Sequence, residues 1–160
     1  EGANGIQAMD LVGRKLPKDG GRAIQPLFAL VDKECEEAKA DERVRDIAVR
    51  VEKANSELKA ATLWLVQNAM AAPTNAGAAA YPYMHLAGIV AIGLMWLRMA
   101  RAASAALANG VGDATFYEAK LITARYFTER FTPDAGALRR KLEAGAEALM
   151  ALPAEAFGVA

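Results

Sequence analysis

The stretch VRDIAVRVEKANSELKAATLWL, residues 44–65, decides the fold of this chain. Apolar side chains recur in it every seven residues, at Val44, Val51, Leu58 and Leu65. Further apolar residues lie between them, at Ile47, Ala54 and Ala61. This spacing places them on one side of an α-helix and predicts a long bundle helix that Asp41 can cap. The other side carries charges of both signs, which indicates a solvated face.

The segment 84–99 is apolar on nearly every side, which is typical of a helix in the middle of a bundle. We expect it to follow a loop at 73–75 and to continue as an alanine-rich tail to Asn109 and Gly110. Its small residues permit close approach of other helices, and they are Ala87, Gly88, Ala91 and Gly93. His85, near its start, is interpreted as a packed or capping residue and not as a ligand.

No charged side chain lies between Lys59 and Arg98, so a membrane span has to be considered. The strongly apolar part is shorter than the roughly 20 residues that a spanning helix needs. Proline, asparagine and glycine interrupt the uncharged stretch before that part begins, at Pro73, Asn75, Gly77 and Pro82. We therefore expect a buried core helix and no transmembrane segment.

Two shorter helices are predicted ahead of the long one. The first starts with Asn4 as a cap and runs to about Leu11, and Pro17 with the cluster 19–21 breaks the chain after it. The second covers about 22–39. Its apolar side consists of Ile24, Leu27, Phe28, Val31 and Cys35.

Two more helices are predicted after Gly110. One starts at Asp113, and its inward side is expected to hold Phe116, Tyr117, Leu121, Ala124 and Phe127. The other opens with Thr132 as a cap and Pro133 at the first helical position, and Pro153 ends it. Its inward side is expected to hold Leu138, Leu142, Leu149 and Met150.

The composition narrows the class of function. Of the 160 residues 54% are hydrophobic, enough to fill one helical core. Lysine plus arginine and aspartate plus glutamate each number 19, so we expect no nucleic-acid partner. One cysteine and one histidine exclude an internal disulfide and a cluster of soft metal ligands, and no metal site is predicted. A reducing, cytoplasmic location fits best, and no secretory signal opens the chain.

The single cysteine, Cys35, is interpreted as a packing residue. It falls on the apolar side of its helix, and its neighbours Glu34, Glu36 and Glu37 would raise the pKa of the thiol. A nucleophilic cysteine needs the opposite setting.

The first residues, EGANGIQAMDLVGRKL at 1–16, carry the one distinctive motif. They resemble the acyl-CoA dehydrogenase family, whose members have a Tyr-Glu-Gly-Thr-x-x-Ile-Gln stretch at the start of the last helix of the catalytic core. The run at 10–16 is similar to a bacterial branch with an extra C-terminal helical domain, often labelled 3-methylmercaptopropionyl-CoA dehydrogenase-like. The specific match covers about 1–22, and the resemblance beyond it is diffuse.

The resemblance implies an all-α fold, an antiparallel helical bundle of the acyl-CoA dehydrogenase C-terminal type. Residues 1–21 would be the end of the catalytic-core domain, and 22–160 an extra bundle domain of four or five helices. The start at Glu1 without methionine suggests a fragment. A fragment without flavin and thioester pockets would be inactive, whereas its parent would oxidise an acyl-CoA to a trans-2-enoyl-CoA with FAD.

The resemblance also implies the site residues. Glu1 aligns with the glutamate that removes the α-proton of the acyl thioester in many members, although some members place the base on another helix. Ala3, where the family has threonine, and Asn4 and Gln7 align with residues that touch the flavin. The implied partners are an acyl-CoA substrate, an electron-transfer flavoprotein and further copies in a homo-oligomer.

Other interpretations of the sequence remain. The opening motif can be a plain helix start, with Asn4 as cap and Glu1 at a frayed end. The chain would then be an oligomerisation or docking module with a large exposed apolar patch. That patch would be rich in Tyr81, Tyr83, Met84 or Trp96. A four-helix metal or redox bundle would need paired histidines, and the single one excludes it.

Overall fold

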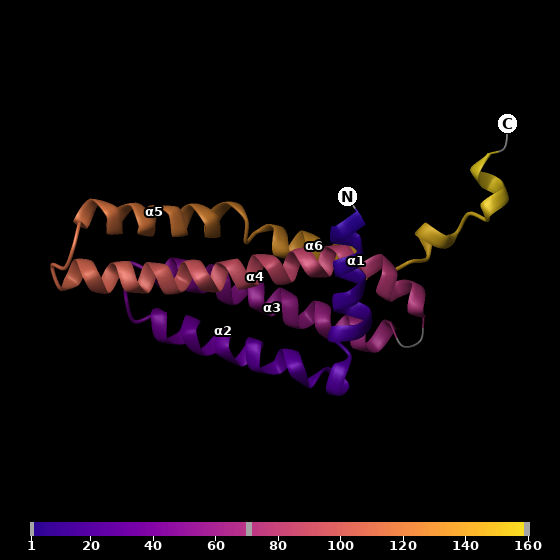
Figure 1. The fold of residues 1–160 in the computed structure, drawn as a ribbon, viewed down its shortest axis with the longest axis horizontal. Coiled ribbons are helices and arrows are strands. Elements are labelled where there is room, and N and C mark those ends of the chain that lie inside the picture. Colours follow the sequence, from indigo (N-terminus) through magenta and orange to yellow (C-terminus); the bar gives the residue numbers. More distant parts are fainter. Residues whose placement is uncertain (1, 70–71, 159–160) are drawn as a thin grey trace.

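The computed structural model describes residues 2–69 and 72–158, and within them every regular element is helical. The α-helices are α1 (Gly2–Asp10), α2 (Gln25–Ala38), α3 (Arg45–Asn68), α4 (Pro73–Ala108), α5 (Ala114–Arg130) and α6 (Asp134–Glu143) (Figure 1). A π-helical turn at Leu11–Lys15 and 3-10 turns at Lys18–Ile24, Ala148–Met150 and Ala154–Phe157 complete the order. The predicted all-α fold is confirmed.

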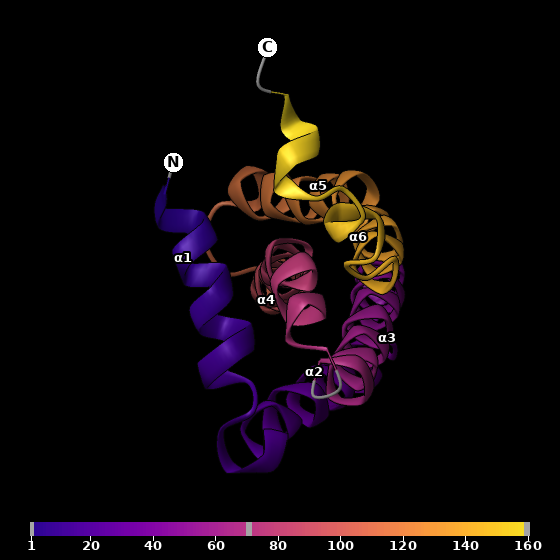
Figure 2. The same cartoon turned by 90° about the vertical axis from the view of Figure 1, so that its right-hand side faces the viewer.

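The helices form an antiparallel bundle around α4. Successive helices α2, α3, α4 and α5 reverse direction along the long axis, and α6 continues the direction of α5 (Figure 1). Seen along that axis, α4 lies in the middle, with α2, α3, α5 and α6 around it and α1 crossing its remaining side (Figure 2). The helix predicted to be central is therefore central.

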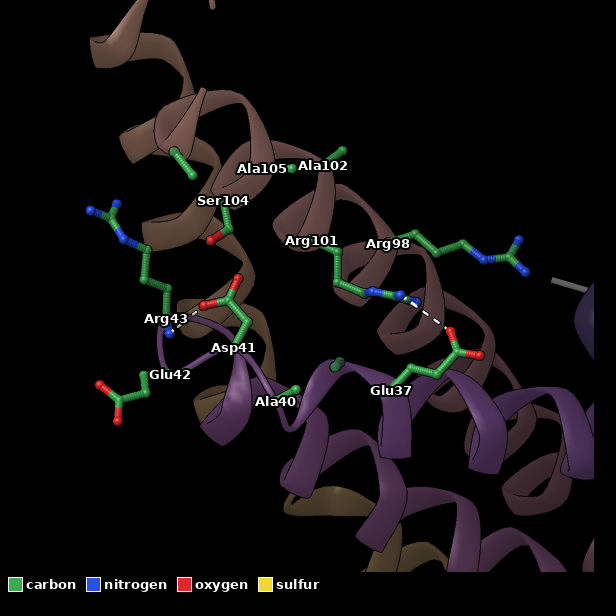
Figure 3. Close-up of a pocket in the computed structure, with 12 residues that line it drawn as sticks. Glu37, Ala40, Asp41, Glu42, Arg43, Arg98, Arg101, Ala102, Ser104 and Ala105 are labelled. Atoms are coloured by element: carbon green, nitrogen blue, oxygen red, sulfur yellow. Dashed lines mark hydrogen bonds and ion pairs between the residues drawn. The ribbon is translucent and has the colours of Figure 1, made fainter. Parts of the chain in front are cut away.

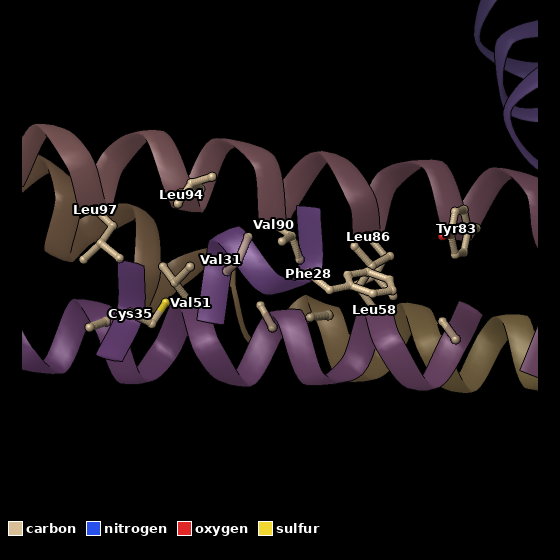
Figure 4. Close-up of a cluster of buried hydrophobic side chains, with 14 of the residues drawn as sticks. Phe28, Val31, Cys35, Val51, Leu58, Tyr83, Leu86, Val90, Leu94 and Leu97 are labelled. Atoms are coloured by element: carbon tan, nitrogen blue, oxygen red, sulfur yellow. The ribbon is translucent and has the colours of Figure 1, made fainter. Parts of the chain in front are cut away.

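The core between α3 and α4 follows the seven-residue repeat. Val44, Val51 and Leu58 are fully buried, and Leu65 is nearly so. Figure 4 shows Val51 and Leu58 facing a row on α4 that consists of Tyr83, Leu86, Val90, Leu94 and Leu97. Side chains of α2 fill the same layer, at Phe28, Val31 and Cys35. Burial of this apolar surface, at about 25 cal/mol per Å², is the main force that holds the bundle together.

The start of α4 corrects the prediction of a loop at 73–75. Pro73 occupies the first turn of a helix of 36 residues, where the missing N–H of proline costs nothing. The break comes one residue earlier, at Ala72, whose backbone is extended. The helix also continues through Pro82, which was expected to interrupt it.

By length and composition α4 could cross a membrane, because 18 consecutive residues of it are apolar enough. In the bundle, however, α1, α2, α3, α5 and α6 all pack against it. Only 39% of the residues in its most apolar window are buried, so one face stays uncovered. The exposed apolar residues on that face are Tyr81, Ile92, Met95 and Met99.

The prediction that the small residues of α4 permit close packing is confirmed at Ala87 and Gly93 and not at the other two positions. Ala87 packs against the core. Gly93 contacts both α3 and α5, since an added Cβ would lie 3.3 Å from Val51 Cγ2 and 3.8 Å from Phe127 Cε1. Gly88 faces open space, and Ala91 is exposed. His85 lies inside the helix with an exposed side chain against Tyr81, so it is neither a cap nor packed in the core.

The predicted break at 19–21 is confirmed, but only one of the four predicted caps is. Asn4 lies inside α1, which already includes Gly2, and Thr132 Oγ1 donates back to Thr128 O and does not cap α6. Asp19, Gly20 and Gly21 have positive φ and end the opening segment. Asp113 caps α5 by accepting a hydrogen bond from Thr115 N at 2.9 Å. Asp41 instead accepts from Arg43 N, two residues before α3 begins, and so closes the preceding turn.

The last helix is shorter than predicted. Gly145, at φ +68°, ends α6, and Asn75 Oδ1 then accepts a hydrogen bond from Ala146 N at 2.9 Å. Leu149 and Met150, expected to point inward, are 68% and 65% exposed because they lie beyond this end. Phe116, also expected inside, is exposed on α5 beneath the Lys120 ammonium.

Candidate functional site

The opening motif forms α1 and the turn after it, and it lies across α4 (Figure 2). Three buried residues at a spacing of four hold it against the bundle, namely Ala8, Val12 and Leu16. Residues 2–7 and Met9 of α1 are exposed, including the large apolar side chains of Ile6 and Met9. The motif segment is therefore fixed on one side and open on the other.

The predicted site residues lie on the open part of α1. Glu1, the predicted base, is outside the described residues. Ala3, Asn4 and Gln7 are all exposed, and Ala3 and Gln7 lie one helical turn apart. The structure thus brings these three together on a surface that a neighbouring group can contact.

An ion-pair cluster stabilises the turn after α1. Arg14 donates to both oxygens of Asp10, with Nη2 at 2.9 Å from Oδ2, and Lys15 Nζ lies 3.2 Å from the same oxygen. The Arg14 hydrogen bond lowers the pKa of Asp10 to about 2. Asp10, Arg14 and Lys15 therefore form one ion-pair cluster that holds the π-helical turn in place.

A charged groove of about 910 Å³ lies at the other end of the bundle. The end of α2, the turn at 40–43 and the last third of α4 line it (Figure 3). Its charged lining residues are Glu37, Asp41, Glu42, Arg43, Arg98 and Arg101. Charges of both signs occur in equal number, so the groove has no net attraction for an anion or a cation.

The arginines of this groove already have partners. Arg98 Nε donates to both carboxylate oxygens of Glu34 at 2.9 Å, and Arg101 Nη2 lies 3.2 Å from Glu37 Oε2. Arg43 Nη1 lies 3.1 Å from Glu118 Oε1. The hydrogen bond from Arg98 lowers the pKa of Glu34. These pairs connect α2 and the 40–43 turn to α4 and α5, and the groove serves the packing of the bundle.

Two buried titratable groups, Cys35 and Tyr83, are protonated and therefore unreactive at neutral pH. Burial raises the pKa of the Cys35 thiol to about 12, with Glu52 and Asp32 adding to the effect. Burial also raises the pKa of Tyr83 to about 12. Neither group can supply a thiolate or phenolate at pH 7, so the interpretation of Cys35 as a packing residue holds.

Metal binding has no support in the part of the chain that the structure describes. No three histidine, cysteine, aspartate or glutamate side chains there come close enough to hold an ion. The single histidine, His85, lies against the Tyr81 ring with the centroids 4.3 Å apart.

The family model described as Acetyl-CoA dehydrogenase C-terminal like matches residues 27–153. The chain belongs to this family. The match covers α2 to α6 and begins after the opening motif.

Curated relatives agree with the family. The chain is 33% identical over 151 residues to a 3-methylmercaptopropionyl-CoA dehydrogenase of Ruegeria pomeroyi. This alignment covers 94% of the present chain and 26% of the relative. It is 27% identical over 165 residues to a broad-specificity linear acyl-CoA dehydrogenase, FadE5, of Mycobacterium tuberculosis. That alignment covers 98% of the present chain and 27% of the relative. The resemblance found in the opening residues is confirmed. The chain spans about a quarter of the length of the relatives that it matches.

Sequence reasoning missed the groove and the ion pairs that line it. Each pair joins residues far apart in the chain, such as Glu34 with Arg98 and Arg43 with Glu118. The only sequence signal is that Arg98 and Arg101 lie one turn apart, as do Glu34 and Glu37. Which glutamate of α2 pairs with which arginine of α4 could be found only from the way the two helices lie against each other.

Proposed function

We propose that this chain is the C-terminal part of an FAD-dependent acyl-CoA dehydrogenase that oxidises an acyl-CoA to a trans-2-enoyl-CoA. The match of the family model to 27–153 carries the proposal. The names of both relatives support it, and so does the motif of the opening residues. The domain boundary near residue 21 belongs to the same proposal, with α1 as the end of the catalytic core.

In this proposal Glu1 is the base of the reaction. Its carboxylate would take the α-proton of the acyl thioester while the β-hydride leaves, so that a double bond forms between the two carbons. FAD, when bound, supplies the acceptor for that hydride. A carboxylate in an apolar acyl pocket would have a raised pKa, which suits a base for a weakly acidic proton.

The three residues on α1 could contact only the edge of a flavin and could not form its whole binding site. Asn4 and Gln7 carry side-chain amides on the exposed part of the helix, and Ala3 can offer only its backbone. An amide can donate to or accept from a polar ring or a phosphate. The proposal gives these three residues a supporting contact, and the rest of the flavin site to the other three quarters of the enzyme.

The exposed apolar residues of α1 support the placement beside a larger core. Ile6 is 68% exposed and Met9 is 50% exposed, on a helix that is otherwise anchored to the bundle. Exposed apolar side chains that lie together on one helix can form part of a contact surface for another part of a protein. We propose that the catalytic core of the parent enzyme packs over Ile6 and Met9.

The parent enzyme would use an acyl-CoA substrate, pass electrons to an electron-transfer flavoprotein and form a homo-oligomer. A cytoplasmic location belongs to the same proposal, with α4 as a core helix and not a membrane span. The isolated chain would be inactive, since it supplies neither most of the flavin site nor the thioester site.

The second candidate is a docking or oligomerisation module without a catalytic role. The predicted patch for it does not form as a unit, because Tyr83 is fully buried and Met84 and Trp96 are partly covered. One observation supports this candidate, namely the uncovered apolar face of α4, which consists of Tyr81, Ile92, Met95 and Met99. The two candidates differ in what they predict for Glu1.

The test is carried out on the full-length enzyme. Acyl-CoA-dependent dye reduction and flavin absorbance are measured for the parent, for Glu1→Gln and for Glu147→Gln as a control at an exposed position beyond α6. We expect Glu1→Gln to keep its flavin and to lose at least a hundredfold in kcat, in line with removal of a general base. Glu147→Gln should match the parent.

A colourless full-length protein without dehydrogenase activity would refute the proposed function. Unchanged turnover in Glu1→Gln would refute only the assignment of the base. The same assays on the 160-residue chain should give neither flavin absorbance nor dye reduction.

A further inference from the structure

The outer side of α5 carries a stripe of residues that are exposed in the described part of the chain. α5 packs on α4 and α3 through its other side, where Leu121, Ala124 and Thr128 are buried. On the outer side Ile122 is 66% exposed and Tyr126 is 57% exposed. Figure 2 shows α5 at the edge of the bundle, and Figure 1 shows the tail at 148–158 extending away beyond α6. The stripe is therefore open to a partner.

The stripe has the pattern of a helix that pairs with another helix. Its members follow one another at alternating intervals of four and three residues, which keeps them in one seam along the helix. They are Thr115, Ala119, Ile122, Tyr126 and Glu129. The three central members are apolar, whereas a helix face that meets only water is normally polar. Because the buried side of α5 already serves the bundle, this second seam indicates a contact outside it.

The charges beside the seam are complementary to those of a second copy. Glu118 and Arg125 lie two helical turns apart on the same flank of the seam. Arg125 has no ion-pair partner among the described residues, and Glu118 uses only Oε1, in an exposed pair with Arg43. Two copies of α5 that run antiparallel can therefore place Glu118 of each copy opposite Arg125 of the other.

Other alignments of two copies bring like charges together. If the antiparallel pair is shifted by one heptad, either Arg125 faces Arg125 or Glu118 faces Glu118. A parallel pair would bring Arg125 of one copy next to Arg130 of the other. Like charges that face each other suppress a wrong pairing. The charges of α5 therefore select a second copy as the partner and antiparallel as its direction.

We propose that this chain forms a two-fold dimer through the outer side of α5, with the two copies of α5 antiparallel. Ala119 of one copy then lies beside Ile122 of the other, and Thr115 beside Tyr126, with two Glu118–Arg125 pairs along one flank. α5 has 17 residues and is about 26 Å long, so the contact lies at the small end of stable interfaces. We expect a dissociation constant on the order of 10 μM.

Within the proposed function, this contact helps to hold the homo-oligomer together. The measurements that test it need neither flavin nor turnover. The dimer and the proposed dehydrogenase activity can therefore fail separately.

Sedimentation velocity of the 160-residue chain, over a concentration series around this value, measures the dimer. Glu118→Arg and Arg125→Glu each put like charges opposite each other in a dimer of one variant, so each alone should weaken dimerisation at least tenfold. A mixture of the two variants should dimerise as the parent does, because each variant then meets the opposite charge at both positions. The double variant Glu118→Arg/Arg125→Glu should recover for the same reason.

The apolar part of the seam is tested with a matched pair of variants. Ile122→Lys places a charge in the middle of the seam and should abolish dimerisation. Leu63→Lys is the control, because Leu63 is a similarly exposed apolar residue on α3, and it should dimerise as the parent does. Urea unfolding of both variants shows whether they remain folded. A folded Ile122→Lys variant that still dimerises would overturn the proposal.

The direction of the pair is tested by cross-linking single cysteines with a short bifunctional maleimide. A mixture of Thr115→Cys and Tyr126→Cys should cross-link and neither variant alone should, whereas a parallel pair would cross-link each variant alone. Cys35 is fully buried, so the parent chain serves as the blank.

Three results would each overturn the proposal, namely a monomeric parent chain, a mixture of the two charge variants that stays monomeric, and cross-linking of either cysteine variant alone. So would the absence of the mixed cross-link in the full-length protein, because the remaining chain would then cover α5.

Discussion

The hydroxyl of Tyr83 on α4 lies 2.8 Å from the hydroxyl of Thr62 on α3, and both side chains are buried. Thr62 donates its single proton to Leu58 O, also at 2.8 Å. Tyr83 is therefore the donor in the pair and Thr62 the acceptor. This bond joins the central helix to the helix that carries the seven-residue repeat.

Removing Tyr83 or Thr62 from this hydrogen bond should lower the free energy of unfolding by different amounts. Tyr83→Phe removes the donor and leaves Thr62 bonded to Leu58, so we expect a loss of about 1 kcal/mol in the free energy of unfolding. Thr62→Val leaves the tyrosine O–H unpaired in the core and should cost about 2–3 kcal/mol. Urea unfolding measures both. In the double variant the loss should be smaller than the two losses added together, and strict additivity would show that the bond is not formed.

Stability should fall at alkaline pH. The folded pKa values of Cys35 and Tyr83 are both raised to about 12, from ordinary values of 9.0 and 10.0. The unfolded chain then releases protons first, so their contribution is complete below pH 9 and is lost as the pH rises toward 12. The slope is at most about 1.4 kcal/mol per pH unit for each group.

Urea unfolding from pH 8 to pH 11 measures this loss. The Tyr83→Phe variant is the control, since it keeps the Cys35 contribution and lacks the tyrosine contribution. Its stability should fall less steeply above pH 10 than that of the parent. Equal slopes would mean that Tyr83 titrates normally in the folded chain.

The seven-residue repeat predicted α3 and its buried face correctly because those positions depend only on helical periodicity. The central position of α4 followed in the same way from its composition. The breaks at Asp19 to Gly21 and the cap at Asp113 were also predictable, since they depend on local backbone preferences.

The errors arose where tertiary contacts outweigh local preference. Pro82 lies inside α4, because the packing of five other helices against it outweighs the loss of one hydrogen bond. Leu149 and Met150 point to solvent, since Gly145 and the bond from Ala146 to Asn75 end α6 before they are reached. The charged groove could not be predicted, because its lining comes from α2, the turn at 40–43 and α4. The role of Glu1 stays a prediction.

Cys35 should resist alkylation in the folded chain. It is fully buried on α2, and its raised pKa leaves a negligible thiolate fraction at pH 8. Labelling with iodoacetamide, followed by mass spectrometry, should be at least a hundredfold slower in buffer than in 8 M urea, on the order expected when reaction needs opening of the core. Glutathione in the same two solutions corrects for the effect of urea on the reagent. Rapid labelling in buffer would contradict the packing of α2 on α3.

The two glycines of α4 should respond in opposite ways to a larger side chain. At Gly88 an added Cβ meets nothing within 4 Å, so Gly88→Ala gains helix propensity alone and should raise the free energy of unfolding by about 0.5–1 kcal/mol. At Gly93 a Cβ would lie 3.3 Å from Val51 Cγ2 and 3.8 Å from Phe127 Cε1, where α3, α4 and α5 meet.

Because Val51 is fully buried and cannot move without disturbing the core, Gly93→Ala should gain less than Gly88→Ala. Gly93→Leu should lose about 1–3 kcal/mol through overpacking. Thermal and urea unfolding of the three variants measure the difference. If Gly93→Leu were as stable as the parent, α3, α4 and α5 could not be in contact at this point, and the central position of α4 would be wrong.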